Sequence, residues 1–308
     1  MDVTLRQLEY AVAVARHRHF GRAASACHAT QPALSSGIAQ LEAALGVLLF
    51  ERGRGGVRPT PAGEEIVRRA EEVLARVEEV RDAARASQGP FSSPLTLGVI
   101  PTVAPFVLPR AVPALRAHFP ELRLVLREEQ TPLLVRAVED GSLDAALLAL
   151  EADLGGAETI ALYRDPFFVA VPPGHRLAAA KSVGEKALRS ERVLLLEEGH
   201  CLRTQVLTVC DRLGLPEATD VRATSLTTLA HMAAGGLGVT VLPAMSLGAG
   251  SGLVGPSAPL RAVRFQGRAP FRTIGLAFRP TTARRVEIEA VADVLRRRAP
   301  DGTEPARP

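Results

Sequence analysis

The chain has 308 residues, of which 47% are hydrophobic and 23% are charged, so it is a globular protein large enough for two or three domains. Its N-terminal stretch is too polar for a secretory signal, and no later apolar run reaches the length of a membrane span. We therefore expect a cytoplasmic protein with no membrane partner. The formal net charge of +4 permits a nucleic-acid partner without requiring one.

The first predicted elements form a helix-turn-helix. Apolar residues recur every three or four positions from Leu5, which predicts a first helix with one buried face. An alanine-rich segment over 20–27 predicts a short second helix. Thr30 is a natural N-cap for a third helix that begins at residue 31, because a proline such as Pro32 is tolerated in the first turn. Short helices joined by a tight turn are typical of this motif.

The third predicted helix and the segment after it form a candidate DNA-binding surface within residues 1–60. Residues 50–60 predict a glycine-turned hairpin, or wing, that carries three arginines. Arginines suit phosphate contacts, whereas small polar side chains on the helix can reach base edges. The candidates are Gln31, Pro32, Ser35, Ser36 and Gln40 in the helix and Arg52, Arg54 and Arg58 in the wing. A small helical domain with a solvated charged loop is the alternative interpretation.

Residues 61–88 predict a long exposed helix that pairs with a second copy of the chain. Apolar residues repeat at alternating spacings of four and three, which is the seam of a coiled coil. They are Ile66, Ala70, Val73, Val77, Val80 and Ala84. Packing of this seam on its own domain is the alternative. Two copies are what a helix-turn-helix protein normally needs on DNA, which favours a homodimer.

Beyond residue 89, short apolar strands alternate with helical segments, which predicts an α/β regulatory part with mainly parallel sheets. The predicted strands cover about 95–100, 122–126, 145–150, 167–171, 192–196, 221–223, 239–242 and 273–278, and the predicted helices about 103–118, 132–140, 201–213, 225–234 and 283–298. Ligands of open α/β sheets bind where strands end and helices begin. Such junctions hold Thr102, Thr131, Cys201 and Ser225, so we expect these residues to face one cleft.

Cys201 and Cys210 lie nine residues apart, and Gly199 and His200 precede the first of them. This pattern indicates a reactive thiol with a second thiol in reserve. In one helix their Cα atoms would be about 13 Å apart, whereas a disulfide needs them within about 7 Å. Disulfide formation would then require the segment to change its conformation, so the pair suits a switch better than a structural crosslink. Cys27, among alanines, is interpreted as a small buried hydrophobe. The three cysteines show no CxxC spacing, which disfavours a metal site, and we expect no metal and no cofactor.

The N-terminal motifs resemble the LysR-type transcriptional regulators: Leu8-Glu9-Tyr10, His19-Phe20, Gln31-Pro32-Ala33-Leu34-Ser35 and Leu49-Phe50-Glu51-Arg52. Later motifs are similar to the peroxide-sensing OxyR branch of that family: Gly98-Val99-Ile100-Pro101-Thr102, Gly199-His200-Cys201-Leu202-Arg203 and Arg272-Thr273-Ile274-Gly275-Leu276. The resemblance implies a mixed α/β fold with a winged helix-turn-helix over 1–60, a dimerising linker helix over 61–88, and a redox-sensing regulatory domain over 89–308. That domain would contain two Rossmann-like subdomains built like periplasmic binding proteins. Subdomain I would take about 94–165 and 268–300, and subdomain II about 166–267.

The resemblance also implies a function. Cys201 would react with hydrogen peroxide, the effector, and Cys210 would resolve its sulfenic acid into a disulfide. Around the peroxide the family's positions fall on Thr102, Thr131, His200 and Arg272. One position departs, since Thr204 stands where the family commonly has an acidic residue. The implied protein is not an enzyme but a regulator of oxidative-stress genes, a homotetramer on double-stranded DNA with RNA polymerase as a further partner.

Other interpretations stay open beside this one. We expect Cys201 at a helix N-terminus, where the helix dipole and His200, Arg203 or Arg272 would favour the thiolate. A LysR-type regulator whose cleft binds a small organic anion would instead leave the cysteines incidental. An enzyme or solute-binding protein on the same scaffold is disfavoured by the N-terminal DNA-binding pattern.

Overall fold

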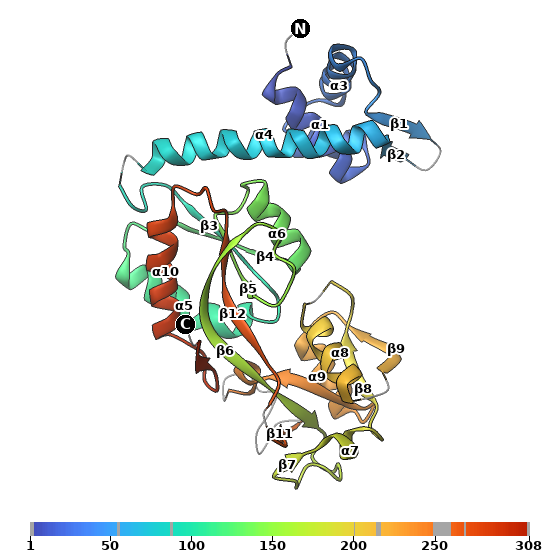
Figure 1. Cartoon of the computed structure of the whole chain (residues 1–308), viewed down its shortest axis with the longest axis vertical. Helices are drawn as coiled ribbons and strands as arrows, with labels where there is room; N and C mark the ends of the chain where they lie inside the picture. Colours follow the sequence, from blue (N-terminus) through green and yellow to red (C-terminus); the bar gives the residue numbers. More distant parts are fainter. Residues whose placement is uncertain are drawn as a thin grey trace. The chain divides into compact units, whose positions relative to one another are not determined.

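The computed structural model describes residues 3–53, 56–86, 89–199, 201–213, 217–248, 260–267 and 269–306. They form two compact units, Met1–Ala84 and Arg85–Pro308 (Figure 1). In the described part of the chain, no helix combines the length and apolar character that a membrane span requires.

The first unit is a winged helix-turn-helix, which confirms the prediction for this part of the chain. It contains α1 (Leu5–His17), α2 (Phe20–Ala26), α3 (Gln31–Leu45), the hairpin of β1 (Phe50–Gly53) and β2 (Gly56–Pro59), and all but the last two residues of the long helix α4 (Pro61–Ala86). Thr30 caps α3, and Pro32 lies in its first turn. Glu42 Oε1 accepts the N–H groups of Leu49 and Phe50 at 2.7 and 3.2 Å, which holds the start of the wing against α3.

The core of the first unit brings α3, the wing and the start of α4 together. Leu34, Ile38 and Leu41 form the buried face of α3. A glycine lets α4 come close to the wing, because a Cβ on Gly63 would lie 2.0 Å from the carbonyl oxygen of Leu49. Any side chain at this position would push α4 away from the wing.

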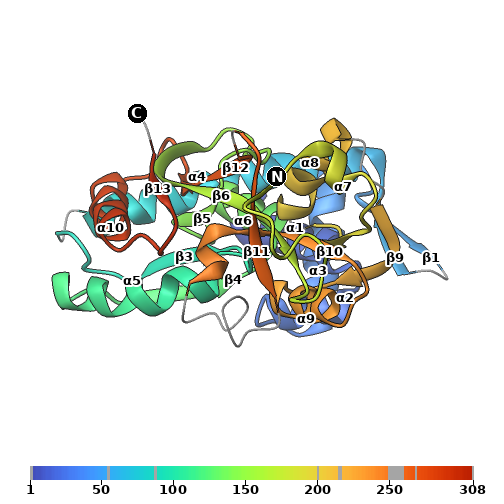
Figure 2. The ribbon, with the colours of Figure 1, turned by 90° about the horizontal axis from the view of Figure 1, so that it is seen from below.

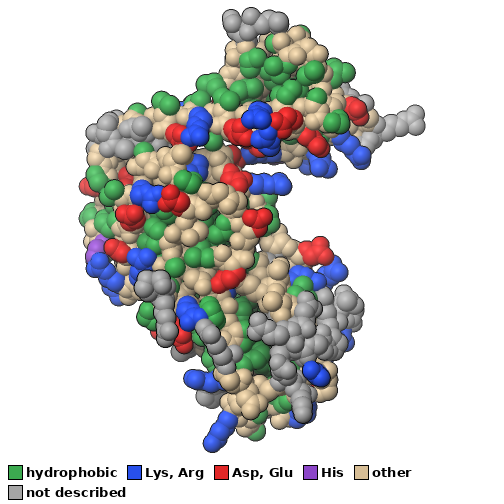
Figure 3. Space-filling view, in the orientation of Figure 1, with side chains coloured by type: hydrophobic (Ala, Val, Ile, Leu, Met, Phe, Trp, Pro, Cys, Tyr) green, Lys and Arg blue, Asp and Glu red, His purple; other side chains and the backbone are tan. Residues whose placement is uncertain are grey.

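The apolar seam of α4 is divided between two environments. Near its start, Ile66 and Ala70 pack into the core of the first unit. Further along, Val73 and Val80 are 44% and 70% exposed. Glutamate–arginine pairs three or four residues apart line the helix, and Figure 3 shows acidic and basic side chains next to each other along it. The first half of the seam therefore packs on its own domain, as the alternative interpretation expects. The second half keeps an apolar surface available to a partner helix.

The second unit consists of two α/β subdomains joined by two long strands (Figure 1). Its elements are β3 (Leu95–Val99), α5 (Ala104–His118), β4 (Leu124–Glu128), α6 (Thr131–Glu139), β5 (Ala145–Ala149), β6 (Glu158–Val171), β7 (Ser182–Val183), α7 (Glu185–Leu188), β8 (Val193–Leu196), α8 (Cys201–Leu213), β9 (Glu217–Ala223), α9 (Leu226–Ala234), β10 (Val239–Pro243), the 3₁₀ helix η1 (Ala244–Leu247), β11 (Arg261–Phe265), β12 (Phe271–Phe278), α10 (Arg285–Arg297) and β13 (Glu304–Pro305). The described strands follow the order β4-β3-β5-β12-β6-β10-β8-β9, with β7, β11 and β13 off this path.

Each subdomain has its own hydrophobic core. In the first, α5 and α10 lie next to each other (Figure 2), and α6 packs against β5 and β12. The second core is built around β8, β10 and α9. Because β6 pairs with β12 in the first subdomain and with β10 in the second, it links the two cores.

The prediction of mainly parallel sheets is wrong, because the sheet is mixed. β3 runs parallel to β4 and β5, and β8 runs parallel to β9 and β10. In contrast, β6 is antiparallel to β10, β11 and β12, and β12 is antiparallel to β5. The reason is that the chain crosses into the second subdomain along β6 and returns along β12 in the opposite direction.

The strand predicted over 167–171 covers only the C-terminal end of β6, which begins at Glu158. Arg164, Asp165 and Pro166 resemble a break in the sequence, since polar residues favour turns and proline cannot donate to a strand ladder. In the structure, Asp165 lies directly opposite Arg272 of β12 and forms an ion pair with it. The buried charge is matched, so the strand continues through this point.

Candidate functional site

α8 begins at Cys201, directly after β8 and a tight turn at Gly199. The φ of Gly199 is +92°, and a Cβ there would lie 2.2 Å from Gln130 Oε1, so the turn requires glycine. Gln130 precedes α6 in the first subdomain, and its Nε2 donates to the carbonyl oxygen of Glu198 over 3.5 Å. The turn before Cys201 therefore rests against the opposite subdomain.

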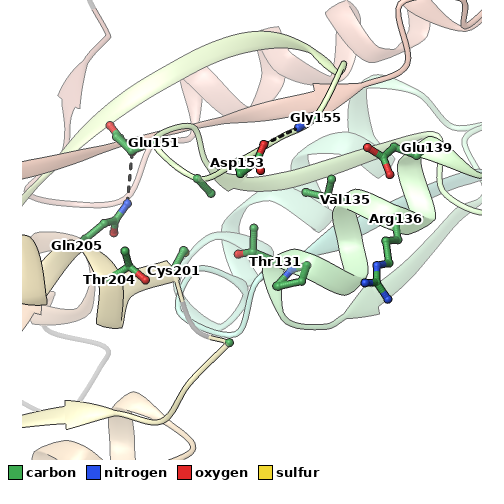
Figure 4. Close-up of a pocket in the computed structure, with 13 residues that line it drawn as sticks. Thr131, Val135, Arg136, Glu139, Glu151, Asp153, Gly155, Cys201, Thr204 and Gln205 are labelled. Carbon is green, nitrogen blue, oxygen red and sulfur yellow. Dashed lines mark hydrogen bonds between the residues drawn. The ribbon is translucent and has the colours of Figure 1, made fainter.

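Cys201 lines a cavity of about 590 Å³ between the two subdomains (Figure 4). Its walls come from α6, from the loop after β5 and from the start of α8. The lining residues are Thr131, Pro132, Val135, Arg136, Glu139, Glu151, Ala152, Asp153, Gly155, Gly199, Cys201, Thr204 and Gln205. Cys201 is a partly buried free thiol that packs against the core of the first subdomain.

Thr131, the first residue of α6, provides a hydroxyl on the opposite wall. It is 5% exposed, and within the described residues its Oγ1 has no hydrogen-bond partner. Figure 4 shows this hydroxyl on the side of Thr131 that faces Cys201. A buried hydroxyl without a partner costs free energy, so it is available to bond a small polar molecule. A thiol and a hydroxyl thus face one cavity from different subdomains.

Carboxylates outnumber cations among the residues that line this cavity. Glu139, Glu151 and Asp153 contribute three carboxylates, and Arg136 contributes one guanidinium. Glu151 also bridges the subdomains, because its Oε2 accepts a hydrogen bond from Gln205 Nε2 at 3.4 Å (Figure 4). The cavity therefore carries an excess of negative charge close to the thiol.

A second group of polar residues is buried where the two long strands pair. Arg272 of β12 has no exposed surface, and its Nε forms a 2.9 Å ion pair with Asp165 Oδ2. The Nη1 and Nη2 atoms of Arg272 donate to Oγ1 and O of Thr102 at 2.9 and 3.1 Å. Asp165 Oδ1 accepts the N–H of Met245 at 3.0 Å. Burial raises the pKa of the Asp165 carboxyl, and the charge of Arg272 opposes this shift.

The predicted site residues therefore fall into two groups rather than one. Cys201 and Thr131 share the cavity, whereas Thr102 and Arg272 share the buried cluster and do not line the cavity. The expectation that strand-to-helix junctions face a single cleft holds for the first pair. No local sequence signal marks Glu151, because its place beside the thiol results from the docking of two subdomains.

The other predicted residues of this part have separate positions. Ser225 caps α9, and its Oγ accepts the N–H of Thr228 at 3.2 Å. Arg203 donates to the carbonyl oxygen of Leu196 at 3.0 Å, within its own subdomain. His200 lies outside the described residues.

Both paired cysteines lie in α8, whose bounds match the predicted helix. A helix rises about 1.5 Å per residue, so nine residues separate the two Cα atoms by about 13 Å. A disulfide needs them within about 7 Å. Although the side chain of Cys210 lies outside the described part, the backbone alone shows that a bond between the two sulfurs requires α8 to unwind.

The candidate DNA-binding residues lie mainly along α3. The exposed ones are Gln31, Pro32, Ser36 and Gln40 of α3 and Arg58 of β2, and Ser35 is half-buried. Gln40 Oε1 already accepts a hydrogen bond from Gln7 Nε2 of α1 at 3.3 Å, which limits its freedom to reach a base. The side chain of Arg52 and the whole of Arg54 lie outside the described residues.

A winged helix-turn-helix followed by a long helix and a two-subdomain unit with a cavity defines a DNA-binding regulator with a sensing unit. Residues 5–64 match the model of the bacterial regulatory helix-turn-helix protein, lysR family, and residues 88–300 match the LysR substrate binding domain. The chain belongs to the LysR family.

Two curated relatives align over nearly the whole chain. The chain is 40% identical over 299 residues to the DNA-binding transcriptional dual regulator OxyR of Escherichia coli (strain K12), with 96% of each protein covered. It is 42% identical over 294 residues to the probable hydrogen peroxide-inducible genes activator of Streptomyces viridosporus, which covers 95% of this chain and 93% of that protein.

Solved structures of similar proteins share the fold. Full-length OxyR of Pseudomonas aeruginosa with a cysteine-to-aspartate substitution has a TM-score of 0.73 and 37% identity, covering 97% of this chain and 99% of that one. A hydrogen peroxide-bound cysteine-to-serine variant of Corynebacterium glutamicum OxyR has a TM-score of 0.63 and 33% identity, covering 96% and 92%.

Proposed function

We propose that this chain is a transcription regulator that senses hydrogen peroxide through oxidation of Cys201. One observation carries the proposal: Cys201 begins α8, shares that helix with Cys210, and faces a cavity in which the Thr131 hydroxyl has no partner among the described residues. Relatives named as hydrogen peroxide-inducible genes activators support the same proposal. The regulated genes would be those of the oxidative-stress response.

The first step is oxidation of the thiol. α8 presents its N-terminus at Cys201, where a helix dipole stabilises negative charge, and a thiolate is the reactive nucleophile. The Cys201 sulfur attacks one peroxide oxygen, the O–O bond breaks, and the departing hydroxide takes a proton and leaves as water. The sulfur is oxidised to a sulfenic acid while the peroxide is reduced. Thr131 is the hydroxyl positioned to bond the peroxide, and His200, the neighbour of Cys201 in the sequence, completes the proposed set. Thr102, Arg272 and Ser225 have their polar groups engaged outside this cavity, so we assign them no direct contact with the peroxide.

The second step converts this oxidation into a change of shape. The Cys210 thiol attacks the sulfenic sulfur, an S–S bond forms, and water leaves. Because the helical separation is too long for that bond, α8 must unwind between the two cysteines. Unwinding would also release the contact of Gln205 with Glu151 and the contact of the preceding turn with Gln130. The docking of the two subdomains would change as a result.

DNA is the partner through which this change is read. We assign base and phosphate contacts to the eight candidates of α3 and the wing, in the usual division between base edges and backbone. The exposed apolar half of α4 supports a homodimer, and we extend this to a homotetramer on DNA with RNA polymerase as a further contact. The excess of carboxylates in the cavity argues against a small organic anion as the effector.

Mass spectrometry of the full-length protein tests the assignment. We expect a slight molar excess of hydrogen peroxide to link the peptides that contain Cys201 and Cys210. Cys210→Ser should keep a trappable sulfenic acid on Cys201, and Cys201→Ser should abolish peroxide-dependent DNA binding and transcription. Cys27→Ser is the matched control, because it removes the third thiol and should leave the linkage intact. A normal peroxide response in Cys201→Ser would contradict the proposal.

A further inference from the structure

We infer that Glu151 and Asp153 make the Cys201 cavity a charge filter, so that the thiol reacts with uncharged oxidants and thiol reagents in preference to anionic ones. The inference deepens the proposed function, because it takes Cys201 as the reacting thiol. It assigns substrate selectivity to two carboxylates that take no part in the chemical step.

The cavity is too large to select among oxidants by their size. The cavity measures about 590 Å³, whereas one water molecule, which is close in size to hydrogen peroxide, occupies about 30 Å³ in the liquid. Cavities of several hundred Å³ accommodate whole organic ligands. Larger peroxides, disulfides and thiols therefore fit beside Cys201, and the walls must discriminate by their chemistry.

The two carboxylates keep their negative charge effective because their partners are neutral. Glu151 accepts hydrogen bonds from the Thr273 N–H at 2.6 Å and from Gln205 Nε2 at 3.4 Å. Asp153 accepts from the Gly155 N–H at 3.1 Å. Among the described residues, neither carboxylate forms an ion pair. Amide donors hold these oxygens in place without cancelling their charge.

The walls of the cavity then act on any charged molecule that enters. A cleft lined by charge of one sign focuses its field and changes the local concentration of ions inside it. Here the carboxylates repel anions before they reach Cys201, while a neutral molecule enters without this cost. The Thr131 hydroxyl, which is buried and has no partner in the described part of the chain, suits such a molecule, because a hydroxyl can both donate to and accept from an uncharged peroxide.

Two disulfide probes of different charge measure the filter on a full-length protein with the substitutions Cys27→Ser and Cys210→Ser, which leave Cys201 as the remaining thiol. One probe is the dianionic 5,5′-dithiobis(2-nitrobenzoate), and the other is the neutral 4,4′-dithiodipyridine. In each case the Cys201 thiolate attacks one sulfur, a mixed disulfide forms, and one aromatic thiolate leaves and is measured by its absorbance. The readout is the ratio of the dianionic rate constant to the neutral one, which cancels changes in thiol reactivity.

Glu151→Gln/Asp153→Asn tests the two carboxylates, because both substitutions keep an oxygen acceptor and remove the charge. We expect the rate ratio to rise about tenfold at low ionic strength and the increase to shrink toward unity in 1 M salt, where the Debye length is about 3 Å. Glu121→Gln/Asp293→Asn is the matched control, since it changes the charge equally at exposed sites outside the cavity and should leave the ratio near its parent value.

An unchanged ratio in the cavity variant overturns the filter, and so does an equal rise in the control variant. Equal acceleration of both probes also overturns it, because that result would report a wider opening rather than a lost repulsion. Failure of the proposed function has a different signature: the absence of sulfenic acid on Cys201 after treatment with peroxide, whatever the probe ratio.

Discussion

Asp165→Asn should strongly destabilise the second unit, because it leaves the guanidinium of Arg272 buried without its counter-charge. Neither side chain of the pair has any exposed surface, and the two are joined at 2.9 Å. Asparagine keeps a carbonyl oxygen that can accept the Met245 N–H, so the substitution removes the charge more than the shape. Removing one partner of a buried ion pair typically costs about 3–5 kcal/mol. We expect the free energy of unfolding to fall by that amount.

Urea unfolding of the full chain, followed by far-ultraviolet circular dichroism, measures this loss. Tryptophan fluorescence is no alternative, because the chain contains no tryptophan. Arg272→Met and the double variant Asp165→Asn/Arg272→Met complete a double-mutant cycle. The double variant should be more stable than Asp165→Asn, because it no longer buries an unmatched charge. Coupling of up to about 3 kcal/mol is expected. A loss below about 1 kcal/mol in Asp165→Asn, or no coupling in the cycle, would refute the reasoning.

Three further predictions concern other parts of the chain. Tyr163→Phe should raise the free energy of unfolding by about 1 kcal/mol, because the phenol is buried and, among the described residues, has no hydrogen-bond partner. Burial also raises the pKa of Tyr163, so the folded state holds this proton more tightly and loses stability as the pH rises above about 10, a loss that Phe should remove in alkaline urea titrations. Gly63→Ala should destabilise the DNA-binding unit by about 1–3 kcal/mol or more. Gly53→Ala should be nearly neutral in thermal unfolding, because no atom of the described residues lies within 4 Å of the new Cβ. Val73→Glu/Val80→Glu should leave the fold intact and shift the protein toward monomer in analytical ultracentrifugation, and an unshifted mass would exclude the α4 seam from the dimer contact.

Local sequence signals predict much of this fold. Thr30 followed by Pro32 marks the start of α3, because a cap and a first-turn proline depend only on neighbouring residues. The bounds of α8 are also predicted correctly. Local signals fail where a contact between distant residues determines the structure. Pro166 predicts the end of a strand, yet β6 continues through it. The reason is that the neighbouring Asp165 forms an ion pair with Arg272, which lies in a strand over one hundred residues later.

The same distinction separates the predicted from the missed parts of the candidate site. Cys201 is recognisable because its own neighbours carry the motif. Glu151 and Asp153 are ordinary acidic residues in a loop, and nothing beside them in the sequence indicates that α8 of the other subdomain will dock against them. Conversely, Ser225 follows a strand as site residues often do, but its hydroxyl is used to cap α9.

The contacts at the subdomain boundary differ in strength, and this difference indicates where oxidation can act. Around α8 the two subdomains are held by hydrogen bonds of 3.4 and 3.5 Å, from Gln205 to Glu151 and from Gln130 to Glu198, which are long and therefore weak. Where β6 and β12 pair, these two long strands are held together by the fully buried ion pair of Asp165 and Arg272. A disulfide that unwinds α8 therefore has to break only the weak hydrogen bonds around α8, whereas breaking the ion pair between β6 and β12 would cost far more free energy. The structural change should therefore begin at the docking of α8 while the crossing of β6 and β12 stays intact.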